Sequence, residues 1–268
     1  MSGTVYLVGA GPGAPDLLTV RAARLLARAD VVLHDALVHP ATLALAAHAE
    51  KIPVGKRCGA HASAQRFINK RLADAARRHA VVVRLKGGDP MLFGRAAEEI
   101  EYLGARGIRV EVVPGVTAAL AAAADLGAPL TRRGAARSVL LVTPRAGAGE
   151  PPNGWARAAA AADTVAIYMG VTEAARVCRE LIAAGRPAAT PAAIVENASL
   201  PGARCLRGTL AELPRLAARA TGGPALILLG EACCAAAASP IIGAWPNEPS
   251  SSSPTARATP AGRNRCAR

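Results

Sequence analysis

The segment from Val81 to Arg95 carries the residue types best suited to holding a ligand. An apolar, β-branched run ends at Lys86 and is followed by the sequence Gly-Gly-Asp-Pro at residues 87–90. Paired glycines let a backbone approach a bound molecule where a Cβ would collide, and the aspartate offers an acceptor. Lys86 and Arg95 make the rim attractive to anions. A plain turn between a strand and a helix can contain the same four residues, but the whole segment predicts a ligand-binding loop.

A second glycine loop follows the first apolar run of the chain, which predicts a strand at residues 4–8. The spacing Gly9-x-Gly11-x-x-Ala14, with an acidic residue about twenty positions later, matches the dinucleotide-binding fingerprint. Pro12, however, removes an N–H where a pyrophosphate needs donors. No Gly-Lys-Ser/Thr follows either, as it does in nucleotide-binding phosphate loops. The loop therefore predicts close backbone contact with a ligand other than a dinucleotide.

Strands that alternate with helices would position these loops, and the apolar spacing of residues 1–114 predicts that order. Ser63 is the expected N-cap of a helix at 64–78. This helix should turn Phe67, Ile68 and Leu72 inward, and helical spacing also begins at Leu17. The other expected elements of this half are strands at 30–33, 52–54, 81–86 and 108–113 and helices at 41–48 and 96–105.

Residues 115–237 predict a second α/β domain, joined to the first at Pro114-Gly115. Strands are expected at 138–142, 164–169, 192–196, 204–208 and 225–230, with helices at 116–126 and 172–184. Residues 145–154 predict a loop rich in Gly and Pro. From residue 238 to 268 the chain is rich in Ser, Pro and Arg and has no apolar periodicity, so we expect a disordered tail.

The 268 residues carry a formal net charge of +13, and 28 of the 32 cationic side chains are arginine. Four arginines and one glutamate in the expected tail account for only +3 of this charge. The remaining positive field concentrates anionic partners, among which nucleic acid, an anionic membrane and a polycarboxylate metabolite are candidates. No single basic helix or basic patch with interleaved aromatic residues occurs, which argues against RNA.

The six cysteines and five histidines show no metal-ligand spacing. No apolar run approaches the ~18 residues that a membrane span requires. The first apolar segment breaks at glycines after a few residues, unlike a signal peptide. We therefore expect a cytoplasmic protein without structural zinc, disulfides or a membrane partner.

Four segments, in order and at compatible spacing, resemble the uroporphyrinogen-III C-methyltransferases of the tetrapyrrole methylase family. They are VYLVGAGPG at 5–13, VGKRCG at 54–59, RLKGGDPMLFGR at 84–95 and VPGVTA at 113–118. The likeness continues through Pro-Leu-Thr at 129–131, Tyr-Met-Gly at 168–170, Val-Glu-Asn at 195–197 and Gly-Pro-Ala-Leu-Ile at 223–227. Among tetrapyrrole methylases, Arg-Leu-Lys-Gly-Gly-Asp-Pro together with Gly-Lys-Arg-x-Gly is specific to this activity.

The resemblance implies two α/β domains of the tetrapyrrole methylase type, with the active site in the cleft between them, and a homodimer. It implies S-adenosylmethionine (SAM) as methyl donor, which leaves as S-adenosylhomocysteine, and no metal. The implied reaction is methylation of uroporphyrinogen III at C2 and C7 to precorrin-2, for sirohaem or cobalamin biosynthesis. The SAM contacts carried over by motif are Pro12, Gly87, Gly88, Asp89, Leu92, Thr117, Ala118, Met169 and Ala198.

The resemblance also makes Asp35 the proton acceptor and Lys56 the proton donor. A pyrrole carbon attacks the sulfonium methyl in line, and the methylated pyrrole then loses a proton, for which a carboxylate is a reasonable base. Without the resemblance, the alternative for Asp35 is a strand-end acid that caps a helix, and the alternative for Lys56 is a solvated loop cation. The cations expected to bind the substrate carboxylates are Arg95, Arg84, Lys56, Arg132 and Arg133.

Five positions depart from the usual family pattern without removing a proposed catalytic group. His34 replaces tyrosine, Arg132 replaces histidine, Pro144-Arg145 replaces Gly-His, and Ala198 replaces glycine. The dehydrogenase and ferrochelatase module of some relatives is not recognised, so no NAD or iron chemistry is expected. Two alternatives remain, an RNA methylase of the same fold and a SAM-binding module without activity. The specific glycine blocks argue against the first, and Asp35 with Lys56 argues against the second.

Overall fold

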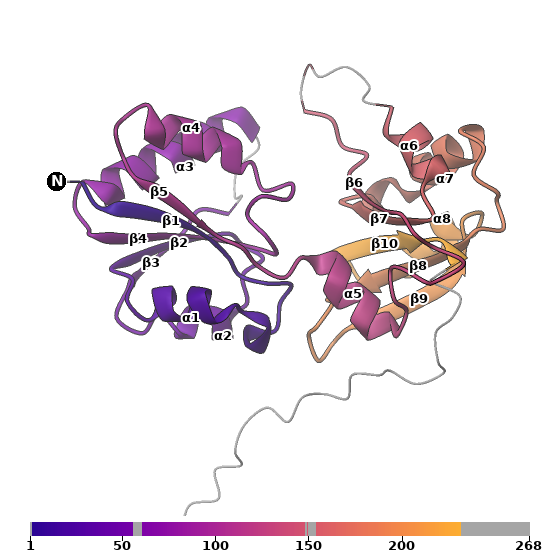
Figure 1. The fold of residues 1–268 in the computed structure, drawn as a ribbon, viewed down its shortest axis with the longest axis horizontal. Helices are drawn as coiled ribbons and strands as arrows, with labels where there is room; N and C mark the ends of the chain where they lie inside the picture. The colour runs from indigo at the N-terminus through magenta and orange to yellow at the C-terminus, as the bar shows by residue number, and fades with distance from the viewer. Residues whose placement is uncertain (1, 56–60, 148, 150–153, 232–268) are drawn as a thin grey trace, which may run out of the picture.

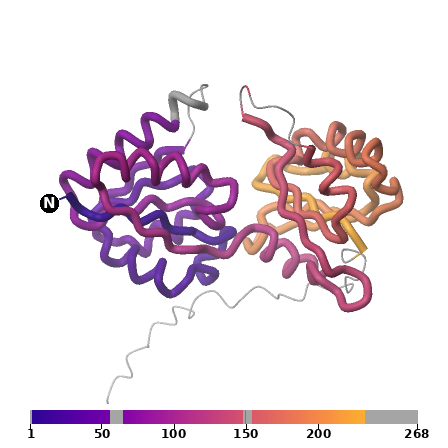
Figure 2. The backbone as a smooth tube through the Cα atoms, turned by 45° about the horizontal axis from the view of Figure 1, so that its top comes forward, coloured from indigo at the N-terminus to yellow at the C-terminus, as the bar shows by residue number. Residues whose placement is uncertain are grey.

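The computed structural model describes residues 2–55, 61–147, 149 and 154–231, with the side chains of 61–64 left out. The expected tail at 238–268 lies outside the described residues. Figure 1 shows two halves, each built on one five-stranded sheet. In Figure 2 they again lie side by side, joined by the segment between residues 113 and 118. The sheets use residues 4–113 and 139–229, and the domain boundary at 114 stays a prediction.

The first sheet is entirely parallel and has the strand order β3-β2-β4-β1-β5. Its strands are β1 (Thr4–Gly9), β2 (Val31–His34), β3 (Glu50–Pro53), β4 (Val81–Lys86) and β5 (Val110–Val113). In register, Val5 of β1 lies opposite Val82 and Val110. Because all five strands run the same way, the loops that follow them meet along one edge of the sheet.

Helices cover both faces of this sheet (Figure 1). They are α1 (Val20–Leu26) and α2 (Pro40–Ala44) on one face, and α3 (His61–Ala76) and α4 (Ala96–Gly104) on the other. Leu26 of α1 packs in one core with Val83 and Leu85. On the opposite face Leu72 of α3 and Leu103 of α4 pack in a separate core with strand residues that include Val82.

Three local expectations in this half are wrong. The helix expected from Leu17 begins at Val20 after a 3-10 turn at Pro15–Leu17, because the Thr19 side chain caps it by accepting the Ala22 N–H at 3.2 Å. Helix α3 begins at His61, so Ser63 lies inside it and is not its N-cap.

Phe67 of α3 is also not buried as expected: 55% of its surface is exposed, and the Arg71 guanidinium lies 4.9 Å from its ring. Ile68 and Leu72, in contrast, are buried as predicted. They are four residues apart and define the inward stripe, while Phe67 lies about 100° around the helix from Ile68.

The second sheet is mixed and has the strand order β6-β7-β10-β8-β9. Strand β6 runs parallel to β7, and the other neighbours are antiparallel. The strands are β6 (Val139–Val142), β7 (Thr164–Tyr168), β8 (Pro191–Glu196), β9 (Arg204–Thr209) and β10 (Ala225–Leu229). The helices are α5 (Ala118–Leu126), α6 (Trp155–Ala161), the 3-10 turn η2 (Val171–Glu173), α7 (Ala174–Ala183) and α8 (Leu213–Ala217).

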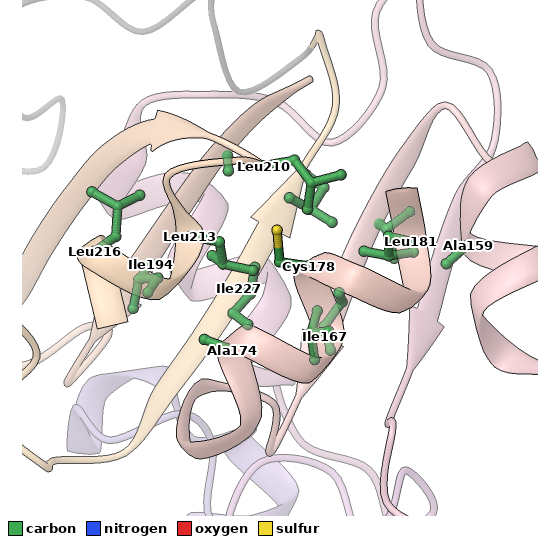
Figure 3. Packing of buried hydrophobic residues seen from close by; sticks show 14 of the residues in the cluster. Ala159, Ile167, Ala174, Cys178, Leu181, Ile194, Leu210, Leu213, Leu216 and Ile227 are labelled. Carbon is green, nitrogen blue, oxygen red and sulfur yellow. The ribbon is translucent and has the colours of Figure 1, made fainter. Parts of the chain in front are cut away.

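The second sheet is also covered on both faces. Leu181 and Cys178 of α7 pack in the core that contains Ile167 and Ile227 (Figure 3). The other face is covered by the alanine-rich α5, whose small side chains and Leu126 form a separate core with this sheet. The short helices α6 and α8 were not among the predicted elements, because one is nearly all alanine and the other has only five residues.

Candidate active site

The two glycine loops follow β1 and β4, which are neighbours in the middle of the first sheet. The chain leaves β1 for α1 on one face and leaves β4 for α4 on the opposite face. Open α/β sheets bind ligands at such a switch point, beyond the carboxyl ends of the strands. Asp35, directly after β2, and Gly115, shortly after β5, follow strands at the same edge.

The loops after β1, β4 and β5 pack backbone against backbone. The Gly11 N–H donates to the carbonyl oxygen of Gly88 at 3.2 Å, and the Gly88 N–H donates to that of Gly11 at 2.7 Å. A Cβ on Gly115 would lie 2.3 Å from the Gly88 oxygen, and one on Gly9 would lie 2.6 Å from the Gly115 Cα. Glycine is therefore required at 9 and 115 by the protein's own packing.

Gly87 and Gly88 differ from these glycines because space beside them is open. A Cβ on Gly87 would meet only the Cβ of Leu37, at 3.7 Å, and one on Gly88 only the Cα of Thr117, at 3.9 Å. Gly88 has a φ of +65°, which favours glycine for conformational reasons. At Gly87 neither packing nor a positive φ calls for glycine. The absence of a side chain there leaves room for a ligand, and the SAM contacts at Gly87 and Gly88 stay predictions.

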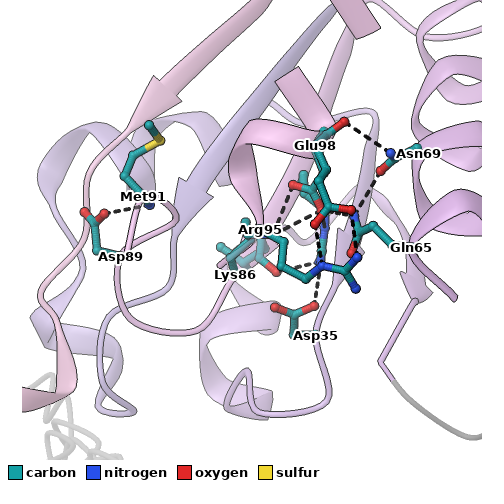
Figure 4. A network of polar contacts seen from close by, with 11 residues as sticks. Asp35, Gln65, Asn69, Lys86, Asp89, Met91, Arg95 and Glu98 are labelled. Carbon is teal, nitrogen blue, oxygen red and sulfur yellow. Dashed lines mark hydrogen bonds and ion pairs between the residues drawn. The ribbon is translucent and has the colours of Figure 1, made fainter. Parts of the chain in front are cut away.

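Asp89 ties this loop to the start of the second half. Its Oδ1 accepts the Met91 N–H at 2.8 Å, and its Oδ2 accepts the Gly115 N–H at 2.9 Å (Figure 4 shows the first of these bonds). Each carboxylate oxygen has a further lone pair. Asp89 thus has a structural role in addition to the SAM contact that the motif predicts, and the latter stays a prediction.

Asp35 lies beside β4 because its N–H donates to the carbonyl oxygen of Leu85 at 3.2 Å. One carboxylate oxygen, Oδ1, accepts a hydrogen bond from Nη2 of Arg84 at 2.5 Å. Among the described residues no donor bonds to the other oxygen, and 32% of the side chain is exposed. Asp35 therefore combines a fixed orientation with a free acceptor, the two properties that a general base needs.

Asp35 is the first of four charged side chains that form a row of ion pairs, with Arg84, Glu99 and Lys86 as the buried members (Figure 4 shows this polar network). Nε of Arg84 donates to Oε1 of Glu99 at 3.1 Å, and Nζ of Lys86 donates to both oxygens of Glu99 at 3.1 and 3.0 Å. Gln65 of α3 donates to the same Glu99 at 3.2 Å. Burial, and next the positive charge of Arg84, lower the pKa of Lys86, whereas Glu99 acts in the opposite direction.

This row corrects two expectations about the cations of the loop. Arg84 was predicted to bind substrate carboxylates and Lys86 to line the rim, but they are only 2% and 3% exposed. Their charged groups bind the carboxylates of Asp35 and Glu99. The sheet directs both side chains beneath the helix layer, so the structure gives Arg84 a contact with the proposed base in place of a contact with substrate.

Of the other predicted substrate cations, the three that the structure describes, Arg95, Arg132 and Arg133, are exposed. Arg95, at the end of the loop, has a φ of 56° and donates through Nε and Nη2 to the carboxylate of Glu98 at 2.6 and 2.7 Å. This hydrogen bonding raises the pKa of Arg95. Arg132 and Arg133 lie in a turn of the second half, which backbone bonds between Arg132 and Ala136 close. The predicted proton donor Lys56 lies outside the described residues.

The second half contributes to the site through the end of β7. The Tyr168 hydroxyl lies 2.6 Å from Oγ1 of Thr117 and accepts the Ala119 N–H at 3.2 Å. Its ring contacts Phe93 of the first half, with the ring centres 5.1 Å apart. Burial raises the pKa of Tyr168. The predicted SAM residues Leu92, Thr117, Ala118 and Met169 are thus these contact residues or their immediate neighbours in the chain.

A second junction joins the first glycine loop to the connection between β8 and β9. The Ala14 N–H donates to Oγ of Ser199 at 3.0 Å, and a Cβ on Gly13 would lie 2.9 Å from the Cγ of Leu200. These contacts bring together the loops that contain Pro12 and Ala198, the two remaining predicted SAM contacts. Met169 has a positive φ of 56° and is exposed, in the turn directly after Tyr168.

Sequence reasoning missed Glu99 and Ser199. A signal for Glu99 was present, because it occupies the inward stripe of α4 together with Ala96 and Leu103, where a carboxylate needs a buried partner. Arg84 and Lys86 are two positions apart in the sequence, so their side chains lie on the same face of a strand. Ser199 had no comparable signal, since its partner Ala14 is 185 positions away.

Across residues 2–55, 61–147, 149 and 154–231 no three His, Cys, Asp or Glu side chains are grouped so that they could hold a metal ion. In the same part of the chain no helix has both the length and the apolar character needed to cross a membrane.

Comparison with known proteins shows the family. Residues 4–214 match the tetrapyrrole (corrin/porphyrin) methylases. The chain is 50% identical over 232 residues to a sirohaem synthase of Pseudomonas fluorescens, a match that covers 86% of this chain and 50% of that protein. The chain therefore spans about half the length of the curated relatives it matches. Together with the parallel sheet and its glycine loops, these matches show that the chain belongs to the tetrapyrrole methylase family.

Solved structures agree with this assignment. A uroporphyrin-III C-methyltransferase from Thermus thermophilus, complexed with S-adenosylhomocysteine, is 44% identical with a TM-score of 0.76, and the match covers 86% of this chain and 98% of that one. A cobalt precorrin-4 methyltransferase is 33% identical with a TM-score of 0.75, and covers 86% and 95% respectively. The two-domain α/β fold expected from the sequence is thereby confirmed.

Proposed function

We propose that this chain is a SAM-dependent methyltransferase that methylates uroporphyrinogen III at C2 and C7 and forms precorrin-2. The observation that carries the proposal is the Asp35 carboxylate, which has one oxygen held by buried Arg84 and the other free among the described residues. It follows a strand at the same sheet edge as the open glycine pair at 87 and 88. The similarity to the Thermus enzyme supports both the methyl donor and the substrate.

The residues at the sheet edge fit a bound SAM. When bound, SAM supplies an electrophilic methyl group on its sulfonium. The backbone at Gly87 and Gly88 is accessible to a ligand. The other proposed SAM contacts lie in loops that contact one another, and they are Pro12, Leu92, Thr117, Ala118, Met169 and Ala198. Holding two reactants in line is worth up to ~7–11 kcal/mol of a barrier, so positioning by these loops supplies much of the acceleration.

The second requirement of the reaction is a base. The sulfonium transfers its methyl group as CH₃⁺, so the methylated tetrapyrrole gains one positive charge. Loss of a proton from the tetrapyrrole removes this charge. Asp35 accepts this proton at its free oxygen, while the bond from Arg84 keeps the carboxylate facing the site. Lys56 remains the proposed proton donor on the strength of its motif, Gly-Lys-Arg-x-Gly.

The positive charge of the chain suits a polycarboxylate substrate. The net charge is +13, and the exposed Arg95, Arg132 and Arg133 are the proposed partners of the substrate carboxylates. Arg95 pairs with Glu98, so a substrate carboxylate competes with Glu98 for its guanidinium. Arg84 is no longer proposed in this role, because it is buried.

Several finer properties follow from the family resemblance. We propose a cytoplasmic homodimer that binds a small-molecule tetrapyrrole and neither nucleic acid nor membrane. The sirohaem synthase relatives support use of the product for sirohaem. This chain also shares its fold with the cobalt precorrin-4 methyltransferase, which is a cobalamin biosynthetic enzyme. Sedimentation of the purified protein tests the oligomeric state, and a mass near that of one chain would contradict the dimer.

The activity is tested by incubating the purified chain with methyl-labelled SAM and anaerobic uroporphyrinogen III. We expect a tetrapyrrole that has gained two labelled methyl groups and has the absorbance of precorrin-2. A parallel incubation with RNA tests the alternative substrate that the basic charge allows. Label in RNA and none in tetrapyrrole would refute the proposal.

The substrate cations are tested by comparing Arg95→Ala with Arg109→Ala. Arg109 precedes β5 and therefore lies at the opposite, amino edge of the first sheet, where it pairs with Glu111. Losing one exposed ion pair costs up to about 1 kcal/mol, which corresponds to a roughly fivefold rise in a binding constant. We expect a rise of this size in the tetrapyrrole KM for Arg95→Ala and no rise for Arg109→Ala. Salt should raise the KM of the wild-type enzyme too. Equal constants in both variants would place the anion site elsewhere.

A further inference from the structure

Glu99 is fully buried, and Arg84 connects it to Asp35, the proposed base. Arg84 and Lys86 are two residues apart on β4, so both side chains point to the same face of the sheet, the one that carries α4. Glu99 of α4 is 0% exposed and bonds to both cations. Of the four charged side chains in this row, Asp35 is 32% exposed and the other three are at most 4% exposed.

The geometry of Arg84 makes Glu99 more than a counter-ion. A guanidinium is planar, so the directions of its N–H groups are fixed relative to one another. Glu99 accepts from Nε at 3.1 Å, and Nη2 is thereby directed at Asp35, to which it donates at 2.5 Å. The third nitrogen, Nη1, donates to the carbonyl oxygen of Leu85 at 3.3 Å. Two fixed acceptors therefore determine how Arg84 presents its last donor to Asp35.

We propose that Glu99 is a positioning residue for the methyl transfer, because it orients Arg84 and Arg84 in turn holds one oxygen of Asp35 while the other faces the substrate. The inference rests on the proposed function, in which Asp35 is the base. A different explanation is that Glu99 only neutralises two buried cations. In that case Glu99 affects the rate of methyl transfer only by balancing the buried positive charge. Any substitution that restores the charge balance should then restore the rate.

Three variants of the full chain separate these explanations. Glu99→Leu removes both acceptor oxygens. Lys86→Met combined with Glu99→Leu also removes one buried cation, which replaces a buried ion pair by apolar groups and is typically neutral or stabilising. Glu101→Leu is the matched control, because Glu101 is an exposed residue of the same helix. For each we would measure Tm, the SAM Kd, the tetrapyrrole KM and the single-turnover rate of methyl transfer.

We expect Glu99→Leu to lower the single-turnover rate roughly 10- to 100-fold, the usual loss when a catalytic group loses its orienting partner. The SAM Kd and the tetrapyrrole KM should stay within about twofold, since Glu99 is fully buried behind the sheet edge. In the double variant Tm should recover toward the wild-type value while the rate stays low, because Arg84 still lacks its carboxylate. Glu101→Leu should match the wild type.

A rate that recovers together with Tm in the double variant would overturn the inference and leave charge balance as the role of Glu99. An unchanged rate in Glu99→Leu would overturn it as well, with the methyltransferase activity of the wild type still intact. If the wild type itself transfers no methyl group to the tetrapyrrole, the proposed function fails, and the inference fails with it.

Discussion

Gly87→Ala should weaken SAM binding without destabilising the fold, whereas Gly115→Ala should destabilise the fold, although both add a single methyl group to loops at the same sheet edge. At Gly87 the new Cβ meets only the Cβ of Leu37 at 3.7 Å, an ordinary contact, and the φ is not in the left-handed region. The free energy of unfolding should therefore change by no more than ~0.5 kcal/mol. At Gly115 the new Cβ lies 2.3 Å from the backbone oxygen of Gly88, which cannot rotate away.

The magnitudes follow from these two environments. Overpacking against backbone costs about 1–3 kcal/mol, and each kcal/mol lowers the Tm of a protein of this size by roughly 2–4 °C. Gly115→Ala should show this loss. If SAM occupies the space beside Gly87, the same overpacking is felt only in the complex, and the Kd of SAM should rise about 5- to 150-fold. Calorimetric unfolding and titration with SAM measure both quantities on the same samples.

Wild-type SAM affinity in a folded Gly87→Ala protein would refute the reasoning, because it would mean that the open space beside Gly87 is not the ligand site. Gly88→Ala serves as an intermediate case. Its space is also open, but its φ of +65° adds strain of about 1–2 kcal/mol to the unliganded protein. It should therefore lower both Tm and SAM affinity.

Three further predictions concern single side chains. Asp35→Asn keeps the size of the proposed base but removes its basicity, so single-turnover methylation should fall by roughly 10²–10⁴ with little change in the Kd of SAM, and a near-normal rate would exclude Asp35 as the base. Tyr168→Phe removes the hydroxyl that bonds to Thr117 and to the N–H of Ala119, and should lower the free energy of unfolding by about 1 kcal/mol, which denaturant titration can detect. Hydrogen bonds from Arg137 and Ser138 lower the pKa of Asp163, so its stabilising effect is present above the ordinary carboxyl range and is lost as pH falls through the lowered value. Asp163→Asn should thus lower Tm at pH 7, and an equal difference at a pH below that lowered value would contradict this account.

Local sequence pattern is enough to predict several parts of this protein. The apolar periods of the first half predict strands alternating with helices, and β1, β2, β4 and β5 all occur within a few residues of their expected positions. A strand followed by a glycine loop is a local feature, so both glycine loops and Asp35 could be assigned to strand ends. In a parallel sheet those ends necessarily share one edge.

The packing of distant segments determines which of the candidate residues are exposed and which are buried. Arg84 and Lys86 belong to a cationic motif that suggested an exposed anion site, but the helix layer buries them against Glu99. Phe67 shows the reverse, since a large apolar residue of a helix remains exposed one position away from the buried stripe.

The glycines differ for the same reason. Gly115 and Gly87 are equivalent as letters in a loop, yet one contacts the backbone of a distant loop and the other contacts open space. Which atoms fill the space beside a residue depends on segments far away in the chain, such as Gly88 beside Gly115 or Ser199 beside Ala14. Local propensity carries no information about those neighbours, because they are brought together only when the two sheets and their helices pack.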